Sequence, residues 1–140
     1  MKVFVNIKQI GQRRQRVAPV PFELERVPET VGELITQTVT TCVTEYNRRV
    51  QNGENAVQPL SGEQINDMSQ IGKIAFGLNY SGKQQDLQKA VDNALQAFND
   101  GLYRVFLNDT ELKSESENIS LRQGDTLTFI RLTMLAGRLF

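Results

Sequence analysis

The sequence predicts an α+β fold in which a mixed β-sheet packs against a long helix. Two segments with alternating apolar residues come first, an amphipathic stretch follows, and further alternating segments close the chain. Both periodicities occur within 140 residues, the usual size of one domain. We therefore expect residues 1–140 to form a single domain.

The first two strands are expected at residues 2–7 and 20–24. Their apolar positions recur at every second residue: Val3, Val5 and Ile7 in the first strand, and Val20, Phe22 and Leu24 in the second. Pro21 has no N–H for a ladder, so that side of the second strand should face solvent or a bulge. The basic residues 11–16 are expected to form an exposed hairpin loop.

A long helix is expected from Thr30 to about Val50. Thr30 and Glu33 have the spacing of a capping box, and Pro28 lies two residues before it. The apolar residues then repeat at intervals of three and four, as on one helical face: Val31, Leu34, Ile35, Val39, Cys42, Val43, Tyr46 and Val50.

The middle of the chain is less regular. We expect a loop at residues 53–62, a short helix at 61–70, and a hairpin or an irregular packed segment at 74–82. A clearer helix is expected at residues 84–99, with Gly101 placed for a left-handed C-terminal cap. Its apolar stripe consists of Leu87, Val91, Ala94, Leu95 and Phe98.

The last third of the chain predicts further strands. Residues 102–107 form an apolar run that turns at Asn108 and Asp109 into residues 111–112. A second turn is expected at residues 123–125, and the last strand should run from Thr126 to about Met134.

Two parts of this last third resemble ubiquitin and the related sulfur-carrier proteins. Residues 105–112, Val-Phe-Leu-Asn-Asp-Thr-Glu-Leu, resemble the strand and turn after the ubiquitin helix, and residues 119–127 resemble the crossing to its final strand. The resemblance implies a ubiquitin-like β-grasp fold, with residues 53–101 as a helical insertion before the third strand. Residues 124–132 also resemble the ending of a family of bacterial proteins.

The resemblance raises the hypothesis of a ubiquitin-like modifier or sulfur carrier. Those families end in Gly-Gly, whereas this sequence has Ala136-Gly137 followed by Arg138, Leu139 and Phe140. Activation at Gly137 would therefore require removal of the last three residues.

The residue inventory argues against an enzyme. There is no histidine, and the single cysteine, Cys42, lies on the apolar stripe of the first helix. Catalytic triads, Cys–His dyads and His/Cys zinc sites are thereby excluded. The available carboxylates have no recognisable partner spacing: Asp86, Asp92, Glu111, Glu115 and Glu117. We expect no catalytic residue, cofactor or metal.

The composition also bears on location and partners. The N-terminus lacks a signal-peptide pattern, and no apolar run approaches the ~20 residues of a membrane span. We therefore expect a cytoplasmic protein. Arg13, Arg14 and Arg16 suit phosphate contacts, but no aromatic residue interleaves them and the net charge is zero, which disfavours nucleic acid.

Our first hypothesis is a noncatalytic domain that binds another protein. The last strand is partly apolar on both faces, with Leu127 and Phe129 on one and Ile130 and Leu132 on the other. The second face either binds a partner or is covered by the helix at residues 84–99. The predicted partner-binding residues are Ile130, Leu132, Leu135, Leu139 and Phe140. The oligomeric state stays open.

Overall fold

The computed structural model describes residues 1–9, 20–51, 72, 76 and 83–131, which have an α+β fold with one five-stranded mixed sheet. The strands and the two helices that enclose the core are, in chain order, β1 (Lys2–Gln9), β2 (Val20–Glu23), α1 (Val31–Gln51), α3 (Leu87–Asn99), β3 (Tyr103–Leu107), β4 (Thr110–Leu112) and β5 (Thr126–Arg131).

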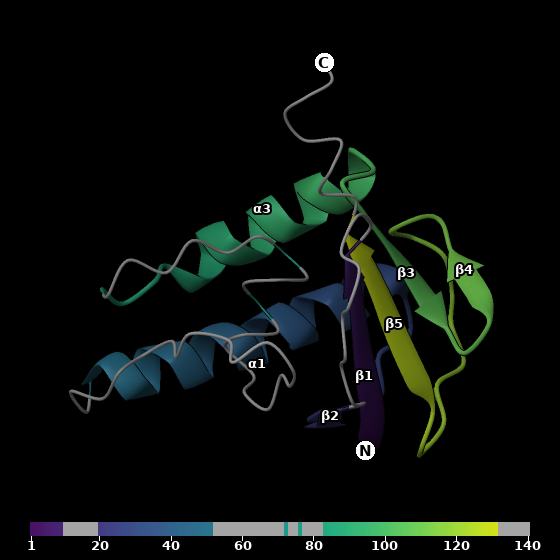
Figure 1. Cartoon of the computed structure of the whole chain (residues 1–140), viewed down its shortest axis with the longest axis horizontal. Helices are drawn as coiled ribbons and strands as arrows, with labels where there is room; N and C mark the ends of the chain where they lie inside the picture. Colours follow the sequence, from purple (N-terminus) through teal and green to yellow (C-terminus); the bar gives the residue numbers. More distant parts are fainter. Residues whose placement is uncertain (10–19, 52–71, 73–75, 77–82, 132–140) are drawn as a thin grey trace.

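The strand order is β2-β1-β5-β3-β4 (Figure 1). The first and last strands, β1 and β5, are parallel neighbours in the middle of the sheet, and the other pairings are antiparallel. β2 is an edge strand, which accommodates Pro21 as the sequence requires. The sequence-based strand positions are confirmed, and the part of the last strand expected beyond Arg131 lies outside the described residues.

Helix α1 begins where the capping-box spacing predicts. The Glu33 N–H donates to Thr30 Oγ1 at 3.2 Å, and Glu33 Oε1 accepts from the Glu29 N–H at 3.0 Å. In a capping box the Glu33 side chain would accept from the N–H of Thr30, but here it accepts from the N–H of the preceding residue. The N–H groups of Val31 and Gly32 donate to the carbonyls of Glu117 and Glu115. The N-terminal donors of α1 are thus satisfied within the domain.

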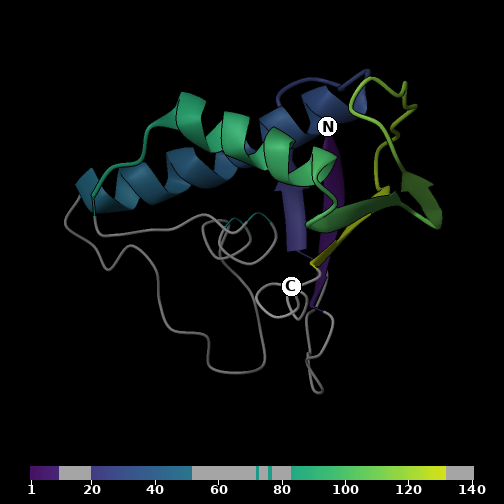
Figure 2. The same ribbon diagram turned by 90° about the horizontal axis from the view of Figure 1, so that it is seen from above.

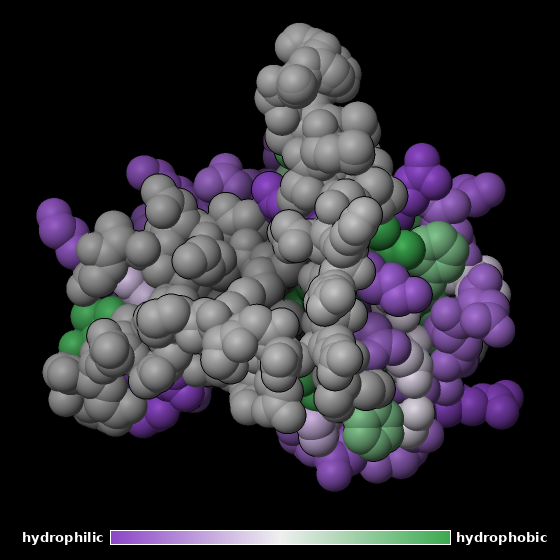
Figure 3. Space-filling view, viewed as in Figure 1, coloured by the Kyte–Doolittle hydropathy of each residue, from purple (hydrophilic) through white to green (hydrophobic). Residues whose placement is uncertain are grey.

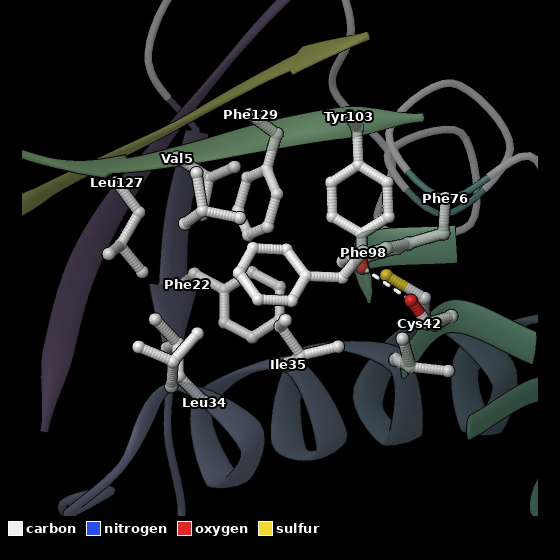
Figure 4. Close-up of a cluster of buried hydrophobic side chains, with 14 of the residues drawn as sticks. Val5, Phe22, Leu34, Ile35, Cys42, Phe76, Phe98, Tyr103, Leu127 and Phe129 are labelled. Atoms are coloured by element: carbon white, nitrogen blue, oxygen red, sulfur yellow. Dashed lines mark hydrogen bonds between the residues drawn. The ribbon is translucent and has the colours of Figure 1, made fainter. Parts of the chain in front are cut away.

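One face of the sheet packs against the helices and forms the core (Figure 4). Val5, Leu127 and Phe129 point from the strands toward Leu34 and Ile35 of α1, and all five side chains are buried. Thr38 is also buried in this layer although it is polar. Its hydroxyl donates to the Leu34 carbonyl at 2.8 Å, so no donor is lost.

Helix α3 lies beside α1 and runs in the opposite direction, on the same side of the sheet (Figures 1 and 2). Asn47 of α1 fixes the approach to α3, since its amide accepts from the Gln85 N–H at 2.7 Å and donates to the Gln85 carbonyl at 3.0 Å. Asp86 caps α3 by accepting from the Lys89 N–H, and Gly101 follows with φ +77°. The predicted helix end is therefore confirmed.

The predicted apolar stripe of α3 is correct only in part. Val91, Ala94 and Phe98 are buried, but Leu87 is 40% exposed and Leu95 is half-buried. Ala90, which was not in the predicted stripe, is buried. Val50 in α1 was likewise predicted on the apolar face and is only half-buried.

The packing of α3 excludes the alternative in which this helix covers the second face of the last strand. Tyr103, on the core face of β3, donates its hydroxyl to the Ala94 carbonyl at 2.7 Å, and its ring lies 5.9 Å from that of Phe98. The helix at residues 84–99 therefore packs on the core side of the sheet and does not cover the face that carries Ile130.

Several expected segments lie outside the described residues: the loop at 11–16, the loop at 53–62 and the short helix at 61–70. Within residues 74–82 only Phe76 is described. It is helical and buried, and its ring lies 5.3 Å from Tyr103 and 5.2 Å from Phe129.

Tyr103→Phe is expected to lower the free energy of unfolding by about 1 kcal/mol at pH 7, because the bond to Ala94 is lost. Burial raises the pKa of the Tyr103 phenol above its ordinary value. The unfolded phenol ionises near pH ~10, so the wild type loses stability as the pH rises beyond that value, whereas the variant lacks this loss.

The difference in free energy of unfolding between wild type and Tyr103→Phe should therefore decrease between about pH 10 and pH 11.5. Urea unfolding of both proteins across this range measures it, and the remaining tyrosines cancel in the comparison. A difference that stays constant with pH would contradict a buried, neutral phenol in this position.

Candidate functional site

The candidate site is the sheet face that points away from the helices. We call it the outer face and define it by residues of the five strands: Lys2, Phe4, Asn6, Lys8, Pro21, Glu23, Arg104, Phe106, Glu111, Thr126, Thr128 and Ile130. These positions alternate with the buried residues of each strand, so the sheet pleat directs them outward. Figure 3 shows apolar side chains in green set among purple hydrophilic ones over the strands.

Strand register arranges the outer face in rows across the sheet. One row is Lys8, Ile130 and Arg104 on β1, β5 and β3. The next is Asn6, Thr128, Phe106 and Glu111 on β1, β5, β3 and β4. A third is Pro21, Phe4 and Thr126 on β2, β1 and β5. Apolar side chains thus occur in every one of these rows.

Three large apolar side chains on this face, Phe4, Phe106 and Ile130, are half-buried rather than enclosed. They come from different strands and are held by the central pairings of the sheet. Lys8 and Arg104 are exposed on either side of Ile130, so the first of these rows combines an apolar centre with two cations.

The turn before β5 is fixed by hydrogen bonds that hold one end of the outer face. Asp125 accepts from the Arg122 N–H at 2.8 Å, and Asn108 Oδ1 accepts from the Thr126 N–H at 3.1 Å. Gly124 has φ +89° and Asn108 has φ 53°, backbone conformations that glycine and asparagine tolerate best. The outer face is therefore carried by well-supported strands.

Of the predicted partner-binding residues, the structure describes Ile130. It places Ile130 on the outer face, as the alternation of the last strand indicated. The remaining predicted contacts lie outside the described residues: Leu132, Leu135, Leu139 and Phe140, together with Gly137 and the anion-contact candidates Arg13, Arg14 and Arg16.

Sequence reasoning did not select Lys8, Arg104 or Phe106. The period-2 pattern gives the face of each residue, but only the register between strands places Lys8 and Arg104 on either side of Ile130. These residues are far apart in the sequence.

The polar side chains singled out as possible acid–base groups have structural partners. Asp92 accepts from Gln88 Nε2, Glu115 from Asn99 Nδ2 and Glu117 from the Lys113 N–H. Asp86 caps α3, and Glu111 Oε2 lies 3.9 Å from Arg104 Nε. Cys42 is buried in the core.

One further carboxylate, Glu45, has a perturbed pKa. The hydrogen bond from the Arg48 guanidinium holds the pKa of Glu45 below its ordinary value, and Arg49 adds to the effect. This is an ion pair on the surface of α1. Within the described part of the chain, no group of three or more His, Cys, Asp or Glu side chains is arranged to hold a metal ion.

A hollow of about 630 Å³ lies between the start of α1, the end of α3 and the loop before β5. Polar side chains in its lining include Thr36, Gln37, Asn99 and Ser114. Because the N–H groups at the start of α1 already donate to the loop and to Thr30, this helix end has no free backbone donors for an anion.

Comparison with protein families, with curated proteins and with solved structures finds no match. Among the described residues, no helix is long and apolar enough to span a membrane.

Proposed function

We propose that this protein is a noncatalytic interaction domain that binds another protein through its outer face. The observation that carries the proposal is the placement of α3. It packs on the core side through Phe98 and the bond from Tyr103 to Ala94, while Ile130 on the opposite face remains half-buried.

The composition of the outer face supports the same function. Phe4, Phe106 and Ile130 provide apolar and aromatic area within a rim of polar and charged residues. Protein interfaces combine an apolar centre, enriched in aromatic residues, with a polar rim. A face of this kind on a stable sheet is suited to bind a partner without chemical change.

We further propose that the fold is a ubiquitin-like β-grasp with residues 53–101 inserted before β3. The order β2-β1-β5-β3-β4, the parallel pairing of β1 with β5 and the position of α1 directly after β2 support this assignment. β-grasp domains have many unrelated roles, so the fold alone does not carry the function. A cytoplasmic location remains part of the proposal.

The two other hypotheses depend on residues outside the described part of the chain. A modifier or sulfur carrier requires a free Gly137, and nucleic-acid binding requires Arg13, Arg14 and Arg16. Both remain predictions from the sequence.

The test is affinity capture from a lysate of the source cells with matched variants. The double variant Phe106→Ser/Ile130→Ser removes apolar area from the outer face. The control Val27→Ser/Leu87→Ser removes apolar side chains that are 52% and 40% exposed, one before α1 and one in the first turn of α3. We expect recovery of a specific partner to fall roughly tenfold for the first variant, which corresponds to about 1.4 kcal/mol of binding energy, and to persist for the control.

Thermal unfolding of both variants accompanies the capture, so that a loss of folding is separated from a loss of binding. Equal recovery with wild type and Phe106→Ser/Ile130→Ser would refute the outer face as the binding surface. Loss of recovery with the control alone would refute it too.

A further inference from the structure

The row formed by Lys8, Ile130 and Arg104 indicates the chemistry of the partner. Lys8 pairs in register with Ile130, and Ile130 pairs with Arg104, so the three side chains lie side by side on β1, β5 and β3. Neighbouring strands are ~4.8 Å apart, which places the two cationic residues about 10 Å from each other at their Cα atoms. Ile130 lies between them.

The positive charge of this row is weakly compensated. Arg104 Nε lies 3.9 Å from Glu111 Oε2, at the outer limit of an ion pair, and its side chain is 56% exposed. Among the described residues, no other carboxylate forms an ion pair with Arg104 or Lys8. The adjoining row consists of the neutral side chains of Asn6, Thr128 and Phe106 and, at its β4 end, Glu111, the partner of Arg104. A local positive site therefore exists on a protein of zero net charge.

We propose that the outer face binds an acidic amphipathic segment of a partner protein. An apolar side chain of the segment packs on Ile130, and carboxylates on either side of it pair with Lys8 and Arg104. On an α-helix, residues seven positions apart lie on one face and are separated by about 10.5 Å, which matches the spacing of the two cations. This inference rests on the proposed function and adds the charge and spacing of the ligand.

Other features of the row favour a protein over a nucleic acid. Ile130, an aliphatic residue that cannot stack with a base, occupies the position between the cations. Two cations on a protein without net charge supply few of the phosphate contacts that nucleic-acid affinity requires.

The test is an NMR titration of the full-length protein with a synthetic helical peptide. The peptide carries glutamates seven positions apart with leucines between them, and a matched peptide carries glutamine in place of both glutamates. We expect amide shifts to concentrate at Lys8, Arg104 and Ile130, and the glutamine peptide to bind roughly tenfold more weakly.

Variants of the protein provide the second arm. Lys8→Glu/Arg104→Glu should weaken binding of the glutamate peptide at least as much as the change to glutamine does. Lys83→Glu/Lys89→Glu inverts exposed cations just before α3 and in its first turn, away from the outer face, and should leave binding unchanged. Absence of shifts at millimolar peptide, shifts centred elsewhere, or equal binding of the two peptides would overturn the proposal. Tighter binding of a single-stranded oligonucleotide at the same row would also overturn it.

Capture of the native partner distinguishes a failure of this inference from a failure of the proposed function. Suppose that recovery depends on Phe106 and Ile130 but is unchanged by Lys8→Glu/Arg104→Glu. The outer face then binds a protein, and the acidic character of the partner is wrong. If none of these residues affects recovery, both proposals fail.

Discussion

Phe129→Ala is expected to lower the free energy of unfolding by about 3–5 kcal/mol, the range for loss of a packed aromatic side chain. Phe129 is fully buried on β5, between β1 and β3, and its ring lies 5.2 Å from Phe76 and 6.3 Å from Tyr103. Truncation removes apolar burial and leaves a cavity where the sheet meets the helices. Urea unfolding followed by circular dichroism measures the change.

Phe106→Ala is the matched control, since it makes the same substitution on the adjacent strand but on the outer face. Phe106 is half-buried, so we expect a loss of about 1 kcal/mol or less. If Phe129→Ala does not fold, Phe129→Leu, with an expected loss of about 1.5 kcal/mol or less, preserves the comparison. Equal losses for Phe129→Ala and Phe106→Ala would contradict the assignment of the two faces.

Phe98→Ala is expected to destabilise the whole domain by about 3 kcal/mol in a single cooperative transition. Phe98 is 7% exposed and belongs to the same core as the strands and α1. Its ring lies 5.9 Å from Tyr103. Loosening α3 should therefore lower the stability of the sheet as well, and tyrosine and far-UV signals should report the same midpoint.

Leu87→Ala in the first turn of α3 is the control, because Leu87 is 40% exposed and its truncation should cost about 1 kcal/mol or less. Two separate transitions in Phe98→Ala, with the midpoint of the sheet unchanged, would show that residues 53–101 form an independent unit. That result would contradict the single core described above.

Local patterns were sufficient to predict the strands and the first helix. Alternation placed Val3, Val5 and Ile7 on the core face of β1, and the Thr30–Glu33 spacing located the start of α1. β1 extends to Gln9, beyond the predicted end, because its parallel pairing with β5 continues to Arg131. That pairing joins the first and last described strands of the chain, so a local sequence pattern cannot reveal it.

The candidate site was predictable only in part for the same reason. Ile130 was found because its own strand alternates. Lys8 and Arg104 were missed because their proximity depends on register across β5. The sequence also left open which face of the sheet the helix at residues 84–99 covers. The answer depends on contacts between residues of α3 and β3, namely the buried hydrogen bond from Tyr103 to Ala94 and the packing of Phe98 on Tyr103.

The most direct test of the outer face as a protein-binding surface is site-specific photocrosslinking in the source cells. Benzoylphenylalanine replaces Phe106 in one protein and Leu87, an exposed residue in the first turn of α3, in another. The account predicts a discrete covalent adduct with a second protein from position 106 and none from position 87. An adduct from position 87 with none from position 106 would contradict it.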